Sequence, residues 1–202
     1  MENPGKVSKR NEVSPKTLRL VESAVMLGLA TALSMVKLWQ MPLGGSVTLC
    51  SMLPILLISY KYGPKWGIGV GFAYSIIQMM LDIGAVFSWG LTPIAVAASF
   101  IFDYLFAFTM LGLAGIYGKG LRQFVCGFST AVGLRFVWHV IAGVTAYLSV
   151  VPKDWAAHPF LYSIAYNGLF LLPDFAICLG VGLLIYRCKP LRNYLDGNTA
   201  SL

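Results

Sequence analysis

Long apolar stretches alternate with short polar breaks along most of this sequence. Six stretches are present, at about residues 18–38, 46–60, 66–86, 92–117, 121–150 and 159–186. Glycine and proline cluster in the breaks, and these residues punctuate helices. Because about 20 apolar residues cross a bilayer as a helix, the pattern predicts an all-α integral membrane protein with six transmembrane helices. The second stretch is short and contains Pro54, so a tilted, kinked or partial span is expected there.

Polar segments flank this apolar region. The predicted organisation is a polar cytoplasmic N-terminal segment at 1–16, a six-helix transmembrane domain at 17–188, and a cytoplasmic tail at 189–202. The first of these lacks the apolar core and small-residue cleavage site of a signal peptide. The first apolar stretch is therefore expected to be a retained helix.

Composition supports a membrane protein and changes the meaning of the charge. Hydrophobic residues make up 57% and charged residues 11% of the chain, with a mean hydropathy of +0.73, which excludes an ordinary water-soluble enzyme and a disordered chain. The net charge of +7 would suggest nucleic-acid binding in a soluble protein. With the N-terminus inside, however, 12 of the 15 basic residues fall in cytoplasmic segments. This bias predicts that both termini are cytoplasmic, and it removes the nucleic-acid interpretation. The twelve residues are Lys6, Lys9, Arg10, Lys16, Arg19, Lys61, Lys65, Lys119, Arg122, Arg187, Lys189 and Arg192.

Motifs for catalysis and nucleotide binding are missing from the sequence. It contains no HExxH, no GxSxG and no phosphate-binding loop, so no enzyme activity is expected. If transport requires ATP, partner subunits have to use it. The cysteines Cys50, Cys126, Cys178 and Cys188 lack CxxC spacing, and neither a disulfide nor a metal site is predicted.

Charged residues inside the predicted spans are costly and usually functional. Counted from the cytoplasmic ends, Asp103, Arg135 and Asp174 lie about 13 or 14 residues up the last three helices, which is roughly 20 Å. His139 lies one turn above Arg135, and Asn167 lies higher on the last helix. These positions predict either a ligand pocket that opens outward, or a buried ion pair of Arg135 with one of the two carboxylates.

Aromatic residues crowd the outer ends of the last two predicted helices and the loop between them. They are Trp138, Tyr147, Trp155, Tyr162 and Tyr166. A single ring is more typical of an interfacial anchor, but aromatic faces also stack on flat rings and attract cations. Two carboxylates against one arginine leave a local charge of −1 if both are ionised, and a cation or a proton would balance it. Together these groups favour a flat cationic ligand.

Small residues form a stripe on the first predicted helix. Ala24, Gly28 and Ala32 are spaced four residues apart, so another helix can approach closely along them. Either a neighbouring span of this chain or a separate membrane partner would fit such a surface.

Two short segments carry a family resemblance. Residues 135–143 read RFVWHVIAG and residues 162–168 read YSIAYNG, which is a basic residue with His four positions later and Ala-Gly, followed by Tyr-Ser and Asn-Gly. Also similar are LPI at 53–55 with Ser59 and Gly63, and Asp103-Tyr104 with GLAG at 112–115. In this combination, residues 18–188 resemble the thiamine-specific substrate-binding subunits (S components) of energy-coupling factor (ECF) transporters.

The resemblance implies an S-component fold in the bacterial plasma membrane that binds thiamine from outside with high affinity, without a cofactor of its own. Asp103 takes the place of an acidic residue, usually Glu, that would balance the thiazolium charge or bind the pyrimidine amine. Tyr162 and Asn167 are expected to hydrogen-bond the aminopyrimidine, and His139 the hydroxyethyl arm. The substrate-binding residues expected in this way are Asp103, Tyr104, Arg135, His139, Gly143, Tyr147, Trp155, Tyr162 and Asn167.

The resemblance also implies partners and moving parts. Ala24, Gly28 and Ala32 would dock on a transmembrane coupling subunit that two ATPase subunits drive. The loops at 39–46 and 151–158 would close over the ligand. Asp174 is not part of the family pattern, and Asp at position 103 is one methylene shorter than the usual Glu.

Other classes of function stay open. A stand-alone proton-coupled thiamine carrier could use Asp103 or Asp174. An S component could also bind another vitamin or a thiamine precursor. A purely structural membrane protein would bind no ligand tightly.

Overall fold

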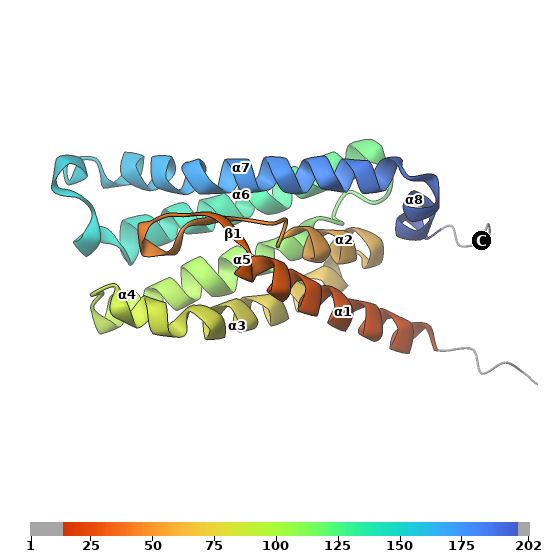
Figure 1. Ribbon diagram of the computed structural model, residues 1–202, viewed down its shortest axis with the longest axis horizontal. Helices are drawn as coiled ribbons and strands as arrows, with labels where there is room; N and C mark the ends of the chain where they lie inside the picture. Colours follow the sequence, from red (N-terminus) through yellow and green to blue (C-terminus); the bar gives the residue numbers. More distant parts are fainter. Residues whose placement is uncertain (1–13, 198–202) are drawn as a thin grey trace, which may run out of the picture.

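A computed structural model describes residues 14–197 as an elongated helical molecule (Figure 1). Five helical segments in this part are long and apolar enough to cross a membrane. Four of them are α1 (Pro15–Met35), α3 (Pro64–Ser88), α6 (Leu121–Thr145) and α7 (Pro159–Arg187). The fifth, Pro93–Leu113, is composite. The structure therefore confirms a mainly helical protein with several membrane-spanning helices.

The composite segment changes its helical geometry along its length. It consists of α4 (Pro93–Ser99), the π-helical η2 (Phe100–Phe106), α5 (Ala107–Thr109) and the 3₁₀-helical η3 (Met110–Leu113). Thr92 caps its start, because its hydroxyl accepts a hydrogen bond from the amide of Ala95 at 3.3 Å. π-helical turns are rare and are frequently found at functional sites.

The second apolar stretch differs from the expected helix. Strand β1 (Lys37–Gln40) and strand β2 (Ser46–Thr48) form an antiparallel hairpin around the short 3₁₀ turn η1 (Pro42–Gly44), so the protein is not entirely α-helical. Only Leu53–Tyr62 forms a helix there, α2. Ten helical residues span about 15 Å, half the hydrocarbon core. A count of six helices therefore includes one that is too short to cross a bilayer by itself.

Helix α2 nevertheless lies at the centre of the packing. Eight of its ten residues are buried, and they contact α3, η3 and α1. The Ser59 hydroxyl donates a hydrogen bond to the carbonyl of Gly112 at 2.5 Å and accepts one from the amide of Gly115 at 3.1 Å. A Cβ on Gly67 or Gly112 would overlap the backbone of the other, so glycine is required where α3 meets η3. Small residues allow this close helix contact.

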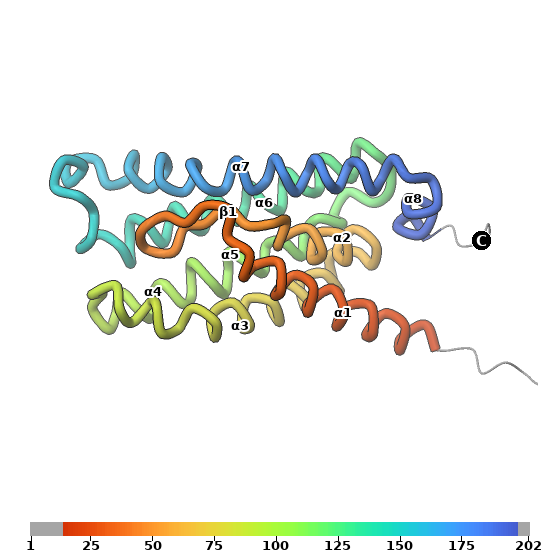
Figure 2. The backbone as a smooth tube through the Cα atoms, viewed as in Figure 1, coloured from red at the N-terminus to blue at the C-terminus, as the bar shows by residue number. Residues whose placement is uncertain are grey.

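The remaining elements close the two ends of the molecule. The loop between α6 and α7 contains the 3₁₀ turns η4 (Leu148–Val150) and η5 (Lys153–Trp155), and α8 (Lys189–Asp196) follows α7. The first turn of α1 and helix α8 lie at one end, whereas the hairpin and the α6–α7 loop lie toward the other (Figure 2). The predicted segments 1–16 and 189–202 lie partly outside the described residues.

A group of hydrogen-bonded side chains ties this first end together, and we call it the terminal cluster. Glu22 accepts hydrogen bonds from Lys61 at 2.6 Å, from Tyr62 and from Tyr194, so α1, α2 and α8 meet at one carboxylate. Lys119 donates to the carbonyls of Tyr60, Lys61 and Leu195 at 2.6–3.0 Å, which are at or near the C-terminal ends of α2 and α8. The terminal cluster consists of Glu22, Lys61, Tyr62, Lys119 and Tyr194.

Candidate functional site

A cavity of about 360 Å³ opens between the hairpin and the long helices. This volume is in the range of small-molecule sites. Its walls come from the end of α1, the hairpin, α3, the composite segment, α6 and α7. Eight of the nine predicted substrate-binding residues line it: Asp103, Tyr104, Arg135, His139, Gly143, Tyr147, Tyr162 and Asn167.

Trp155 is the predicted residue that does not line the cavity. Its side chain is 42% exposed, and its ring lies 5.9 Å from that of Tyr162. The two predicted closing loops differ in the same way. Leu43, Gly44 and Gly45 from the hairpin turn line the cavity, whereas no residue of 151–158 does.

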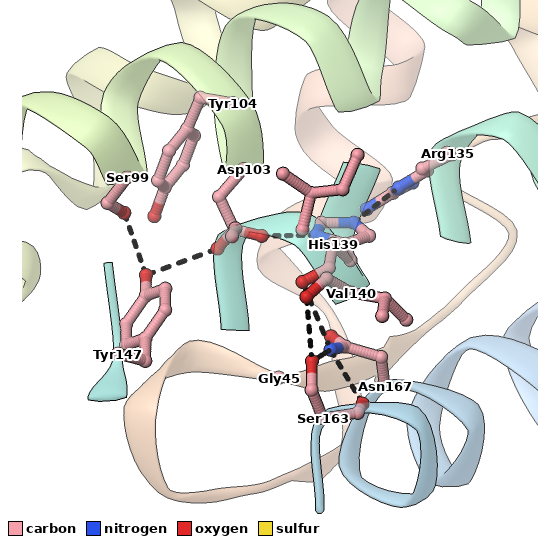
Figure 3. A network of polar contacts seen from close by, with 12 residues as sticks. Gly45, Ser99, Asp103, Tyr104, Arg135, His139, Val140, Tyr147, Ser163 and Asn167 are labelled. Carbon is pink, nitrogen blue, oxygen red and sulfur yellow. Dashed lines mark hydrogen bonds and ion pairs between the residues drawn. The ribbon is translucent and has the colours of Figure 1, made fainter. Parts of the chain in front are cut away.

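Asp103 lies at the centre of the polar wall, in the middle of the π-helical η2. The wider π turn changes the phase of the side chains, and Asp103 faces α6 while the adjacent Tyr104 faces α3. The Asp103 carboxylate contacts Nδ1 of His139 through one oxygen and accepts a hydrogen bond from the Tyr147 hydroxyl at 3.1 Å through the other (Figure 3). The Tyr147 hydroxyl is in turn 2.7 Å from that of Ser99. The carboxylate is therefore fixed in direction at both oxygens.

His139 lies between the Asp103 carboxylate and the buried Arg135 and contacts both. The Nε of Arg135 donates to Nε2 of His139 at 3.0 Å, so Nε2 has to be the acceptor and Nδ1 carries the proton that faces Asp103. The network thus assigns a neutral imidazole between a cation and an anion. Within residues 14–197, neither Asp103 nor Asp174 pairs directly with Arg135, so neither predicted ion pair forms. The guanidinium also lies 4.1 Å from the centre of the Phe108 ring.

Arg135 keeps unused hydrogen-bonding capacity. Its side chain is buried, and its Nη1 atom has no hydrogen-bond partner among the described residues. A buried donor without a partner is costly. Since Arg135 lines the cavity, a polar ligand atom in the cavity can satisfy this donor.

Asp174 makes different contacts from those of Asp103. It accepts hydrogen bonds from the amide and the hydroxyl of Thr48 at 2.9 and 3.0 Å, and this hydroxyl lies 2.7 Å from that of Ser51. Asp174 therefore attaches the end of β2 to α7 at the base of the cavity. This contact gives a structural reason for a residue that lies outside the family pattern.

Close packing of α6 against α7 explains why residue 143 is glycine, and it fixes the orientation of the Asn167 side chain. A Cβ on Gly143 would overlap the Ser163 hydroxyl, which donates to the carbonyl of Val140 at 3.1 Å. The amide nitrogen of Asn167 donates to the carbonyls of His139 and Ser163 at 3.2 and 2.9 Å. Its Oδ1 is therefore the atom left for a ligand.

Sequence reasoning missed the way in which the hairpin is held over the cavity. The Tyr166 hydroxyl accepts a hydrogen bond from the amide of Gly45 at 3.1 Å and donates one to the carbonyl of Pro42. Gly44 has a φ of +94°, and a Cβ there would contact the Trp89 ring at 2.7 Å. Glycine at position 44 therefore serves both the backbone turn and the close approach of the Trp89 ring.

Acidic side chains outnumber basic ones in the cavity wall. Asp82, Asp103 and Asp174 line it together with Lys37 and Arg135, which leaves a charge of −1 when all three carboxylates are ionised and His139 is neutral. Asp82 accepts a hydrogen bond from Tyr104 at 3.2 Å. In that ionisation state, one monovalent cation balances the charge of the wall.

Comparison with known proteins agrees with this architecture. The family model described as thiamine transporter protein (Thia_YuaJ) matches residues 20–193. The thiamine transporter ThiT of Bacillus subtilis is 31% identical over 192 residues, covering 88% of this chain and 94% of the relative. A solved structure of ThiT from Listeria monocytogenes has the same fold, with a TM-score of 0.67 at 19% identity over 87% of this chain and 97% of that one. The chain therefore belongs to the thiamine transporter (Thia_YuaJ) family, whose members are transporters and not enzymes, and it is a multi-pass protein of the bacterial plasma membrane.

Proposed function

We propose that this protein is the substrate-binding subunit of an ECF-type vitamin importer and binds thiamine from outside the cell. The end of the molecule with the hairpin faces outward in this proposal, and both termini face the cytoplasm. Docking through α1 on a coupling subunit, with separate ATPases, then drives release.

The arrangement around Asp103 carries the proposal. Thiamine is a monocation built from two flat rings joined by a methylene group, and the cavity wall has a net charge of −1 when its carboxylates are ionised. A carboxylate fixed by His139 and Tyr147 keeps its acceptor direction without the ligand, so little reorganisation is needed on binding. The Nη1 of Arg135 and the Oδ1 of Asn167 supply a donor and an acceptor for the neutral polar groups of the ligand.

Phosphate esters fit the same wall less well. A monophosphate replaces the single positive charge of thiamine with a net negative charge near neutral pH, which adds to the −1 of the cavity. Like charges in a partly buried site are unfavourable. We therefore assign thiamine itself as the preferred ligand.

The outer face of α1 supports the docking assignment. Ala24, Gly28 and Ala32 are all exposed, and a Cβ on Gly28 would meet nothing within 4 Å. The buried residues of this helix, Ser23, Ala30 and Ser34, lie elsewhere on its circumference. The small stripe is thus available for close contact with another membrane helix.

Thiamine titration of the purified protein tests the binding assignment. Asp103→Asn should weaken binding at least about 30-fold, because a buried charge contact is worth about 2 kcal/mol or more. Asp154→Asn, on the exposed η5 turn, is the matched control and should bind as the wild type does. Unchanged affinity in Asp103→Asn would contradict the role of this carboxylate.

Uptake experiments separate the importer from a stand-alone carrier. Gly28→Leu should bind thiamine normally but abolish uptake in cells that contain the coupling subunit and ATPases, whereas Gly84→Leu, also exposed and unobstructed, should transport. Vesicles with this chain alone should take up no thiamine in a proton gradient. Uptake by such vesicles would instead support the proton-coupled carrier.

A further inference from the structure

A second hollow lies between α6 and α7, on the side away from the cavity. It is an apolar groove of about 730 Å³, and it shares no lining residue with the central cavity. The two helices lie side by side and antiparallel along its length (Figure 1). Because both belong to the membrane-spanning helices, the groove faces the bilayer and not water.

Missing side-chain volume creates the groove. Gly133, Ala165 and Gly168 form its floor, and a Cβ on Gly133 would meet nothing within 4 Å. Leu169 and Leu172, which are 53% and 68% exposed, line it beside these small residues. An open apolar slot of this size loses packing contacts when it is empty, so a chain-like apolar occupant is favoured.

The groove also has a fixed depth in the membrane. Ser129 lies eight residues and Phe136 fifteen residues after Leu121, the first residue of α6, or about 12 and 22 Å along the helix. One leaflet of hydrocarbon is about 15 Å thick. The groove therefore begins near the inner end of one leaflet, and an acyl chain that enters from the end at which α6 begins reaches it with its terminal part.

Two arginines lie at this end, below the groove. Arg122, Ser129 and Gly133 are spaced by seven and four residues, which places them on one face of α6. Arg187 lies about five turns below Leu169 on the corresponding face of α7. Both arginines are exposed, and neither takes part in an ion pair within the described part of the chain. Basic residues between helices at this membrane surface attract anionic headgroups.

We propose that the groove holds the end of one acyl chain of a membrane phospholipid, whose anionic headgroup is bound by Arg122 and Arg187. The apolar groove favours a hydrocarbon chain, and the two arginines favour a negatively charged headgroup. This lipid site is distinct from the thiamine cavity, so its presence does not depend on the proposed importer function.

Native mass spectrometry in micelles that contain equal phosphatidylglycerol and phosphatidylcholine tests the proposal. The wild type should retain one phosphatidylglycerol in preference to phosphatidylcholine. Arg122→Gln and Arg187→Gln should each reduce this preference about fivefold. Lys65→Gln, an exposed cation at the start of α3, is the matched charge control and should leave the preference unchanged.

Filling the groove tests the acyl-chain part separately. Gly133→Leu and Gly168→Leu should lose the retained lipid of either headgroup, whereas Gly69→Leu, an exposed and unobstructed glycine on α3, should keep it. Thermal melting and a single size-exclusion peak show that the variants remain folded. Retention in both groove variants, an unchanged headgroup preference in both arginine variants, or a lipid-free dimer that Gly133→Leu disrupts would overturn the proposal.

Discussion

The central cavity and the terminal cluster are both polar groups in an apolar protein, but their hydrogen bonds are used differently. In the terminal cluster, Glu22 accepts from three side chains and Lys119 donates to three carbonyls. In the cavity, Arg135 Nη1 has no partner among the described residues, and the amide of Asn167 is only half used. The cluster is therefore complete without a ligand, whereas the cavity is not.

This difference indicates how to separate stability from binding in a membrane protein. Buried polar groups that are fully paired hold helices in place, and those with unused capacity are candidates for ligand contact. Substitutions in the terminal cluster should thus change the melting temperature, and substitutions in the cavity should change the affinity. Substitutions at four positions test whether stability and binding separate in this way.

The largest effect on stability is expected for Glu22→Gln. The change leaves Lys61, which pairs with Glu22 at 2.6 Å, as a largely buried cation without its counter-ion, at an expected cost of about 3 kcal/mol. The melting temperature should fall by several degrees, while the protein that remains folded binds thiamine with wild-type affinity. A large loss of affinity in calorimetry at low temperature would show that the two regions are coupled.

Gly143→Ala tests the one position where both properties should change. The added methyl group overlaps the Ser163 hydroxyl and forces α6 and α7 apart, at a cost of about 2 kcal/mol. Melting temperature and thiamine affinity should both decrease. The double variant Gly143→Ala/Ser163→Gly removes the overlap and should recover most of the melting temperature. If it recovers nothing, close packing is not the reason for the glycine.

Thr48→Val separates the hairpin attachment from the ligand contacts. It removes the hydroxyl that donates to Asp174 at 3.0 Å but keeps the backbone hydrogen bond at 2.9 Å. We expect a loss of about 1 kcal/mol, seen as a severalfold weaker affinity with little change in melting temperature. Thr145→Val, on the exposed end of α6, is the control. An unchanged affinity would show that the attachment of β2 does not shape the cavity.

The smallest effect is the pH dependence of Lys119. Burial lowers the pKa of this lysine below its usual value of 10.5, despite the opposite effect of Asp196. The unfolded chain therefore binds the proton more tightly, so this residue makes stability rise as the pH increases from the lowered pKa toward 10.5. Melting curves of the wild type and Lys119→Met should show a steeper rise for the wild type in this range. Parallel curves would contradict the effect of burial.

Much of the cavity was predictable because membrane depth can be counted in residues. Asp103, Arg135 and Asp174 stand at similar heights on three spans, His139 lies one turn above Arg135, and charged residues at such depth require partners. The order of Asp103, His139 and Arg135 in the network was not predictable, since the sequence does not show that His139 lies between the other two. One of the two alternatives that it suggested was a direct ion pair, whereas in the structure His139 lies between Arg135 and Asp103.

The hairpin and the terminal cluster were missed for physical reasons. Hydropathy does not distinguish a short buried strand from a helix, so β2 and α2 together were taken as one span. Lys61 and Lys119 were interpreted as orientation signals, a property that depends on their side of the membrane and not on their contacts. Trp155 was grouped with other rings because it is near them in the sequence, although it does not line the cavity.

The π-helical turn at Phe100–Phe106 restricts which mutations this segment can accept. A π turn contains more residues than an α turn, so deletion of one residue there would restore regular α-helix and change the directions of the side chains within the turn. Asp103 and Tyr104 would then no longer face α6 and α3 together. Substitution of the other residues in this stretch can leave the directions of Asp103 and Tyr104 unchanged, whereas the insertion or deletion of a single residue cannot.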